Sequence, residues 1–175
     1  CHLLERSAGL ELVALDSSAA RLERIRQNLQ RLQLRAEVVC ADATAPASWW
    51  DGRHFERILV DAPCSGSGVI RRHPDIRMLR TPQQIIEASA LQRRILDALW
   101  PCLAPGGILL YCTCTVLPAE NEQVIGAFLG STPDARELPI DVPWGIARSQ
   151  GRQLLPTSGA HDGFYYARLI KNTSA

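Results

Sequence analysis

Short aliphatic runs alternate with longer amphipathic stretches along this chain, and the alternation predicts strands and helices in turn. The predicted strands cover residues 12–16, 37–40, 57–61, 107–112 and 164–170. Residues 131–163 are rich in Pro, Gly and Ser and predict loops around one short strand. Alternating βα units of this kind indicate an α/β fold on a mostly parallel sheet, with an antiparallel strand at the C-terminus.

The predicted helices have recognisable start signals. Ser17 or Ser18 can cap a helix that carries apolar side chains on one face, at positions 22, 25, 29 and 32. A Thr-Pro-Gln-Gln segment at residues 81–84 combines a capping box with proline at the first helical position, and this helix is expected to run to about Trp100. A third helix is expected to open at Pro118, with Glu120 and Glu122 in its first turn.

Composition narrows the class of protein. A chain of 175 residues with 46% hydrophobic positions suits a single domain over residues 1–175. Its 19 basic and 18 acidic residues give a net charge of +1, so any binding of nucleic acid must be local. The longest apolar run, residues 108–112, is too short for a membrane span. Six scattered cysteines and the lack of a recognisable secretion signal favour the reducing cytoplasm.

Three predicted strands end in or near an acid: Asp16, Asp42 and Asp61. Ligands of open α/β sheets bind beyond the carboxyl ends of the strands, so a site is expected there. Asp16 is placed where nucleotide-binding sheets hold ribose hydroxyls, and Asp42 where an adenine amine would be received. For each acid taken alone, a helix cap or turn former is an equally good interpretation.

The segment DAPCSGSGVIRRHPD, residues 61–75, is the most specific in the chain. Cys64 leaves a strand beside a proline, which favours a reachable, functional thiol over a packing residue. The two glycines that follow it are expected to let a ligand approach the backbone. Arg71, Arg72 and His73 form a basic cluster, either for phosphates or as a solvated loop.

The segment YCTCTVLPAEN, residues 111–121, contains two further cysteines. Cys114 lies nearer the loop and is the better candidate for an exposed nucleophile, whereas Cys112 is interpreted as a small core residue. A CxC spacing and four scattered histidines do not predict a metal site.

These two segments, with Asp16, Asp42 and the closing DGFYYARLIK, resemble the S-adenosylmethionine-dependent RNA cytosine-5 methyltransferases. Within that family the RRHPD extension is most similar to the bacterial Sun or RsmB-type enzymes that act on 16S ribosomal RNA. The resemblance implies a Rossmann-like class I methyltransferase sheet, S-adenosylmethionine as cofactor, and a monomer acting on 16S rRNA without a metal or a membrane.

The resemblance also implies roles for individual residues. Cys114 would be the nucleophile that adds to carbon 6 of the cytosine, and Cys64 would assist release by elimination. Asp61 would lie near the transferred methyl group and the target base. Asp16 would bind the ribose of the cofactor and Asp42 its adenine.

One part of the family pattern is missing. The strand and glycine-rich loop of the form DxCAAPGGKT would come immediately before Cys1, and the strand would lie between those ending at Asp16 and Asp61. The sequence is therefore interpreted as the C-terminal part of a catalytic domain. By itself it is expected to bind cofactor weakly, because the loop supplies backbone contacts.

Three other interpretations stay open. A non-catalytic RNA-binding or assembly module could keep the same sheet but would not need two strand-end thiols. A nucleotide-dependent oxidoreductase would be expected to show a GxGxxG motif, which the chain lacks. A papain-like cysteine hydrolase would need a histidine beside its thiol, and His73 is the candidate nearest a cysteine in sequence.

Overall fold

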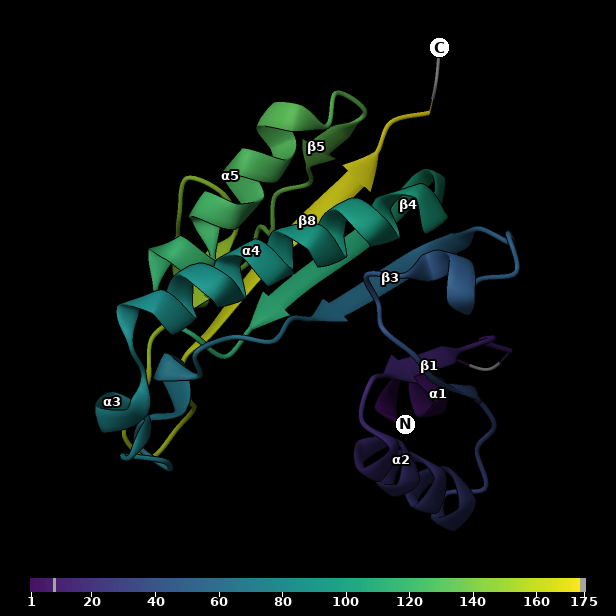
Figure 1. The fold of residues 1–175 in the computed structure, drawn as a ribbon, viewed down its shortest axis with the longest axis horizontal. Helices are drawn as coiled ribbons and strands as arrows, with labels where there is room; N and C mark the ends of the chain where they lie inside the picture. Colours follow the sequence, from purple (N-terminus) through teal and green to yellow (C-terminus); the bar gives the residue numbers. More distant parts are fainter. Residues whose placement is uncertain (8, 174–175) are drawn as a thin grey trace. The chain divides into compact units, whose positions relative to one another are not determined.

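The computed structural model of this chain describes residues 1–7 and 9–173 and shows an α/β fold (Figure 1). The chain divides into two compact units, Cys1–Gly52 and Arg53–Ala175, and each unit has its own sheet. That residues 1–175 form one truncated domain stays a prediction.

The first unit is a small βα arrangement. Its elements are α1 (His2–Arg6), β1 (Val13–Asp16), α2 (Ala19–Arg31), β2 (Glu37–Cys40) and the 3-10 turn η1 (Pro46–Ser48). β1 and β2 pair in parallel, and α2 connects them. The Ser18 hydroxyl accepts a hydrogen bond from the backbone N–H of Arg21, which confirms Ser18 as the N-cap. Leu22 and Leu29 of α2 are buried, as the helical periodicity predicted.

The second unit is built on a mixed sheet with the strand order β3-β4-β8-β7-β6, and β5 pairs with β8. The strands are β3 (Phe55–Asp61), β4 (Leu103–Thr113), β5 (Ala135–Glu137), β6 (Ile146–Ala147), β7 (Arg152–Leu154) and β8 (Phe164–Lys171). β3 and β4 are parallel, and β8 is antiparallel to β4. The predicted antiparallel C-terminal strand is therefore confirmed, and β5, β6 and β7 add further antiparallel pairings.

Two helices cover one face of this sheet (Figure 1). The helical segments are η2 (Ser67–Val69), α3 (Ile76–Leu79), α4 (Pro82–Leu99), η3 (Trp100–Cys102), η4 (Pro118–Glu120) and α5 (Glu122–Ser131). Alternate residues of β8 (Tyr165, Ala167 and Leu169) are fully buried, whereas those between them are half-buried. Apolar side chains from α4 and α5 complete the core, including Leu96 and Phe128.

Two local predictions are wrong. Pro118 opens the 3-10 turn η4 rather than an α-helix, and α5 begins only at Glu122. Glu120 and Asn121 have fully buried side chains that bond to neighbouring loops, so the backbone leaves the helical conformation there. Residues 131–163 contain three short strands instead of one, because the hairpin of β6 and β7 extends the sheet beyond β8.

Phe128 gives a test of this core. Its ring is fully buried and packs edge-on against Trp100, with 5.2 Å between the ring centroids. We expect Phe128→Ala to lower the free energy of unfolding by about 3–5 kcal/mol, because it leaves a cavity in a packed interior. Denaturant unfolding measures the change. Met78→Ala is the control, since Met78 is 84% exposed and its truncation should leave stability nearly unchanged.

Candidate active site

The parallel pairing of β3 with β4 brings the two cysteine segments to one edge of the sheet. Asp61, the last residue of β3, is the Cα partner of Cys112 in β4. Beyond these partners, the turn that carries Cys64 and the loop that carries Cys114 both leave the carboxyl edge of the sheet. This is the edge at which open α/β sheets bind their ligands.

The structure places the sulfur atoms of Cys64 and Cys114 3.4 Å apart, and both side chains are half-buried. Either sulfur could donate in this contact, and Cys64 is the donor when Cys114 is ionised. This bond is the largest influence on both groups: it lowers the pKa of Cys114 to about 7 and raises that of Cys64. Burial and the charge of Asp61 oppose the lowering at Cys114 but do not cancel it. Near neutral pH the arrangement therefore provides a thiolate at Cys114 beside a protonated thiol at Cys64.

Cys112 is a half-buried thiol that contacts Asp61, a contact that the sequence did not predict. Its sulfur lies 3.4 Å from the carbonyl oxygen of Val60 and 3.8 Å from a carboxylate oxygen of Asp61. Burial, followed by the charge of Asp61, raises the pKa of Cys112 to about 12. Cys112 therefore stays protonated while Cys114 ionises, although the two residues are only two positions apart.

The glycine expected to admit a ligand instead admits another part of the chain. Gly68 donates its backbone N–H to the carbonyl of Cys114 and accepts from the N–H of Gly163, both at 2.9 Å. A Cβ atom at Gly68 would lie 2.2 Å from the carbonyl oxygen of Gly163 and 2.8 Å from that of Cys114. Gly68 therefore allows the Cys64 turn, the Cys114 loop and the segment before β8 to meet.

The basic cluster is held by an acid that the sequence analysis did not connect with it. Arg72 Nε lies 2.8 Å, and Arg71 Nη2 3.5 Å, from the carboxylate of Asp162, whose side chain is 7% exposed. His73 is exposed. The two arginines thus tie their turn to the segment before β8, and a contact with phosphates stays a prediction.

Asp16 and Asp42 lie in the first unit, Asp16 as the last residue of β1 and Asp42 just after β2. One carboxylate oxygen of Asp16 accepts the N–H of Ser18 at 2.7 Å, and the other lies 3.6 Å from the exposed Arg21. Asp42 accepts the N–H of Thr44 at 2.8 Å. Both acids therefore act as turn formers, which was one of the two interpretations. Their role toward a cofactor stays a prediction.

Glu120 is the site residue that sequence reasoning missed. It was expected in the first turn of a helix, but its carboxylate is fully buried and bonds to Ser65 and Thr115. These residues directly follow Cys64 and Cys114 in the sequence. The sequence did contain a signal, because Glu120 follows the TCT segment by only a few residues. That acid had already been interpreted as part of a helix start.

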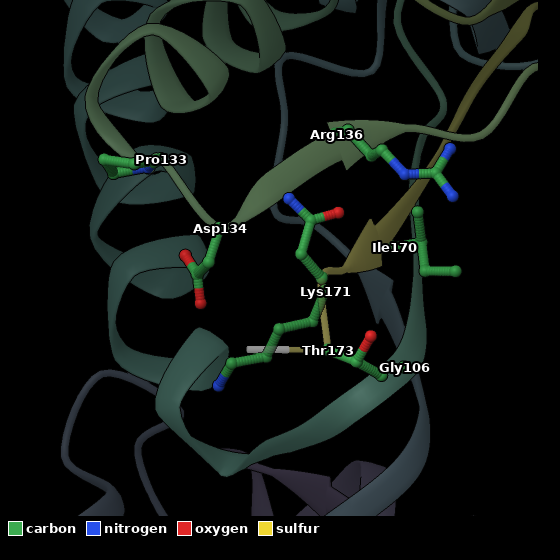
Figure 2. Close-up of a pocket in the computed structure, with 8 residues that line it drawn as sticks. Gly106, Pro133, Asp134, Arg136, Ile170, Lys171 and Thr173 are labelled. Atoms are coloured by element: carbon green, nitrogen blue, oxygen red, sulfur yellow. The ribbon is translucent and has the colours of Figure 1, made fainter. Parts of the chain in front are cut away.

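A separate hollow lies at the other end of β4 (Figure 2). It measures about 580 Å³ and is lined by Gly106, Pro133, Asp134, Arg136, Ile170, Lys171, Asn172 and Thr173. Its central polar groups already form hydrogen bonds within the protein. The Lys171 ammonium donates to the carbonyls of Trp100 and Leu103, and the Asp134 carboxylate accepts from the indole N–H of Trp100. The hollow is therefore unlike the carboxyl-edge site in place and in chemistry.

Residues 1–7 and 9–173 contain no cluster of three or more histidine, cysteine, aspartate or glutamate side chains arranged to hold a metal ion. In the same part of the chain, no helix has the length and apolar character needed to cross a membrane.

Residues 1–170 match the family described as 16S rRNA methyltransferase RsmB/F. The chain is 59% identical over 172 residues to the ribosomal RNA small subunit methyltransferase B of Pseudomonas putida, covering 98% of this chain and 39% of that protein. It also superposes on NSun6 from Pyrococcus horikoshii, solved with SFG, with a TM-score of 0.84, 28% identity and coverage of 99% and 44%. A methyltransferase homolog from the same organism gives a TM-score of 0.76, 32% identity and coverage of 92% and 53%.

The thiol contact gives a direct prediction. We expect Cys64→Ala to raise the pKa of Cys114 toward the ordinary value of about 8.5, because the hydrogen bond that stabilises its thiolate is lost. At pH 7 alkylation of Cys114 should then slow about tenfold, as the thiolate fraction falls from about half to a few per cent. The measurement is the pH dependence of iodoacetamide labelling, read at Cys114 by fragment mass spectrometry. Cys64→Ser keeps a donor and should shift the pKa less, whereas an unchanged profile in both variants would contradict the assignment.

Proposed function

The chain belongs to the 16S rRNA methyltransferase RsmB/F family, and we propose that its enzyme transfers a methyl group from S-adenosylmethionine to carbon 5 of a cytosine in 16S ribosomal RNA. The chain spans about 39% of the length of the curated relative from Pseudomonas putida, so the proposal concerns the complete protein. The contact between the sulfur atoms of Cys64 and Cys114 is the observation that carries it.

Cys114 is assigned as the nucleophile. Carbon 5 of cytosine is a weak nucleophile, and addition of a thiolate to carbon 6 converts the ring into an enamine that is reactive at carbon 5. The lowered pKa of Cys114 supplies the thiolate at neutral pH. S-adenosylmethionine, when bound, supplies the electrophilic methyl group.

Cys64 is assigned to the release step. For release, carbon 5 loses its proton, the double bond between carbons 5 and 6 forms again, and the bond from carbon 6 to the Cys114 sulfur breaks. While Cys114 is bonded to carbon it no longer accepts a hydrogen bond as an anion, so the main cause that raises the pKa of Cys64 is removed. The Cys64 thiol can then lose its proton to water, and the resulting thiolate takes the proton from carbon 5.

Asp61 is assigned to the target base and the methyl group. Its side chain is exposed at the end of β3, beside Cys112. A carboxyl group hydrogen-bonded to N3 of the cytosine would withdraw electrons from the ring and make carbon 6 more open to attack by Cys114. Such contact requires the cytosine to leave its stack, which favours a single-stranded or looped region of the RNA.

Asp16 and Asp42 are assigned to the cofactor, because the arrangement of Asp16 suits hydroxyl donors. One oxygen of Asp16 is held by Ser18, which fixes the direction of the carboxylate, and the other lies 3.6 Å from the exposed Arg21. Asp42 stands at the same end of the neighbouring strand. The proposal also places the enzyme in the cytoplasm, where a reducing environment keeps both thiols free.

Two cysteine variants of the complete protein test the reaction. Cys114→Ala should abolish methyl transfer to 16S rRNA and should form no protein–RNA adduct, because the ring is not activated. Cys64→Ala should accumulate a covalent adduct through Cys114, because addition continues while release is blocked. Radiolabelled methyl transfer and denaturing gel electrophoresis measure the two outcomes.

The control is Cys102→Ala, which removes a buried thiol before β4, at the end of that strand away from the two reactive thiols. It should keep the methyl transfer of the unchanged protein. Full activity of Cys114→Ala would exclude Cys114 as the nucleophile, and normal turnover of Cys64→Ala without an adduct would exclude the release role.

The cofactor assignment has its own test. Asp16→Asn keeps an oxygen for the N–H of Ser18 but removes the charge, so we expect S-adenosylmethionine to bind the complete protein about tenfold more weakly, as is typical for loss of a charged acceptor. Titration calorimetry measures the affinity. Glu23→Gln on the exposed side of α2 should leave it unchanged, and equal affinities for all three proteins would argue against Asp16 as a ligand.

A further inference from the structure

Glu120 is a buried carboxylate whose hydrogen bonds come from both cysteine segments. Its side chain is 0% exposed. One oxygen accepts the backbone N–H of Ser65 at 2.7 Å and the amide of Gln92 at 3.3 Å. The other oxygen accepts the hydroxyls of Ser65 and Thr115. Removing a carboxylate from water is costly unless such donors replace the water, so this network holds its members closely in place.

The network reaches the cysteines by the shortest covalent route. Ser65 directly follows Cys64, and Thr115 directly follows Cys114. The two loops are also bonded to each other, because the hydroxyls of Ser67 and Thr115 lie 2.7 Å apart and the Ser67 hydroxyl accepts the N–H of Val116. The Glu120 carboxylate is therefore linked by hydrogen bonds to the residue next to each of the two sulfur atoms.

The segment that carries Glu120 is itself fixed to the core. The Tyr111 hydroxyl donates to the backbone carbonyl of Glu120 at 2.7 Å, and this tyrosine is fully buried in β4. Asn121, the next residue, accepts from Thr113 and donates to the carbonyl of Thr115. The carboxylate thus projects from a rigid support toward two loops, rather than moving with them.

We propose that Glu120 is a positioning residue, whose carboxylate holds the Cys64 turn and the Cys114 loop in the register at which the two sulfur atoms touch. This inference rests on the proposed function, in which Cys114 is the nucleophile. Glu120 itself touches neither sulfur atom, and its effect passes through Ser65 and Thr115.

The positioning role of Glu120 and the direct effect of its charge would change the pKa of Cys114 in opposite directions. The titratable groups that act on Cys114 are Cys64, Asp61 and Glu120, and Cys114 in turn acts on Cys112. The negative charge of Glu120 raises the pKa of Cys114, whereas the hydrogen bond from Cys64 lowers it and is the larger influence. Removing the charge alone would therefore lower the pKa of Cys114. Removing the support of the Cys64–Cys114 contact would raise it.

The test is Glu120→Gln in the complete protein. The amide has nearly the same shape, but its NH₂ group cannot accept the hydrogen bonds that one carboxylate oxygen now receives. We expect the pKa of Cys114 to rise by about one unit, which slows its alkylation at pH 7 several-fold to tenfold. The kcat for methyl transfer should fall by a similar factor at pH 7 and recover as the pH approaches 9.

The control and the second variant use neighbouring residues. Glu122→Gln removes a carboxylate two positions further on, where Glu122 lies 4.0 Å from Arg148, and should change neither readout. Ser65→Ala removes one hydroxyl donor but keeps the backbone N–H, so it should shift the Cys114 pKa in the same direction by a smaller amount. Circular dichroism and thermal unfolding establish whether each variant is folded. If Glu120→Gln does not fold, the pKa of Cys114 in Ser65→Ala tests the positioning role instead.

An unchanged or lowered pKa of Cys114 in the folded variant would overturn the positioning role. Thiol labelling needs neither RNA nor cofactor, so this result is independent of the proposed function. If Cys114→Ala keeps its activity, the reaction assigned to the site fails while the labelling result still shows whether Glu120 supports the two thiols.

Discussion

A hydrogen bond between two identical side chains gives this site its asymmetry. Cys64 and Cys114 have the same intrinsic acidity, yet one proton between two sulfur atoms 3.4 Å apart lowers the pKa of the acceptor and raises that of the donor. At pH 7 about half of the pairs therefore contain a thiolate at Cys114 beside a thiol at Cys64. A hydrogen bond weakens steeply with distance and angle, so the division depends on how firmly the two loops are held.

The fold supplies that firmness from several directions. Parallel pairing of β3 with β4 sets the two chain segments side by side, with Asp61 opposite Cys112. Gly68 then lets three backbone segments meet at distances that a side chain would prevent. Glu120 joins the same loops from the core side, through hydrogen bonds to Ser65 and Thr115. Strand pairing, close backbone contacts and side-chain hydrogen bonds thus together bring Cys64 and Cys114 into contact, although they are 50 positions apart in sequence.

Sequence reasoning succeeded where the cause of a structure is local. The cap at Ser18 and the capping box of Thr81 with Gln84 are confirmed, because each depends on residues within three positions. Glu120 was placed at a helix start because its burial depends on Ser65, 55 positions away, and no local pattern records that. The pairing of Arg72 with Asp162 was missed for the same reason. The strands β5, β6 and β7 were underestimated because residues in short edge strands look like loop residues.

The lowered pKa of Cys114 bears on the choice between the chemistries considered for such a site. A cysteine hydrolase pairs its nucleophile with a basic histidine, whereas the group in contact with Cys114 is another thiol whose pKa is raised. In the proposed reaction the same sulfur must first add to carbon and then leave it. A thiolate with a lower pKa leaves faster, and it is also more abundant at neutral pH, although each anion is a weaker nucleophile. A pKa close to the working pH is therefore a compromise that suits a reversible adduct, and a hydrogen bond from Cys64 provides it without placing a positive charge beside the ring.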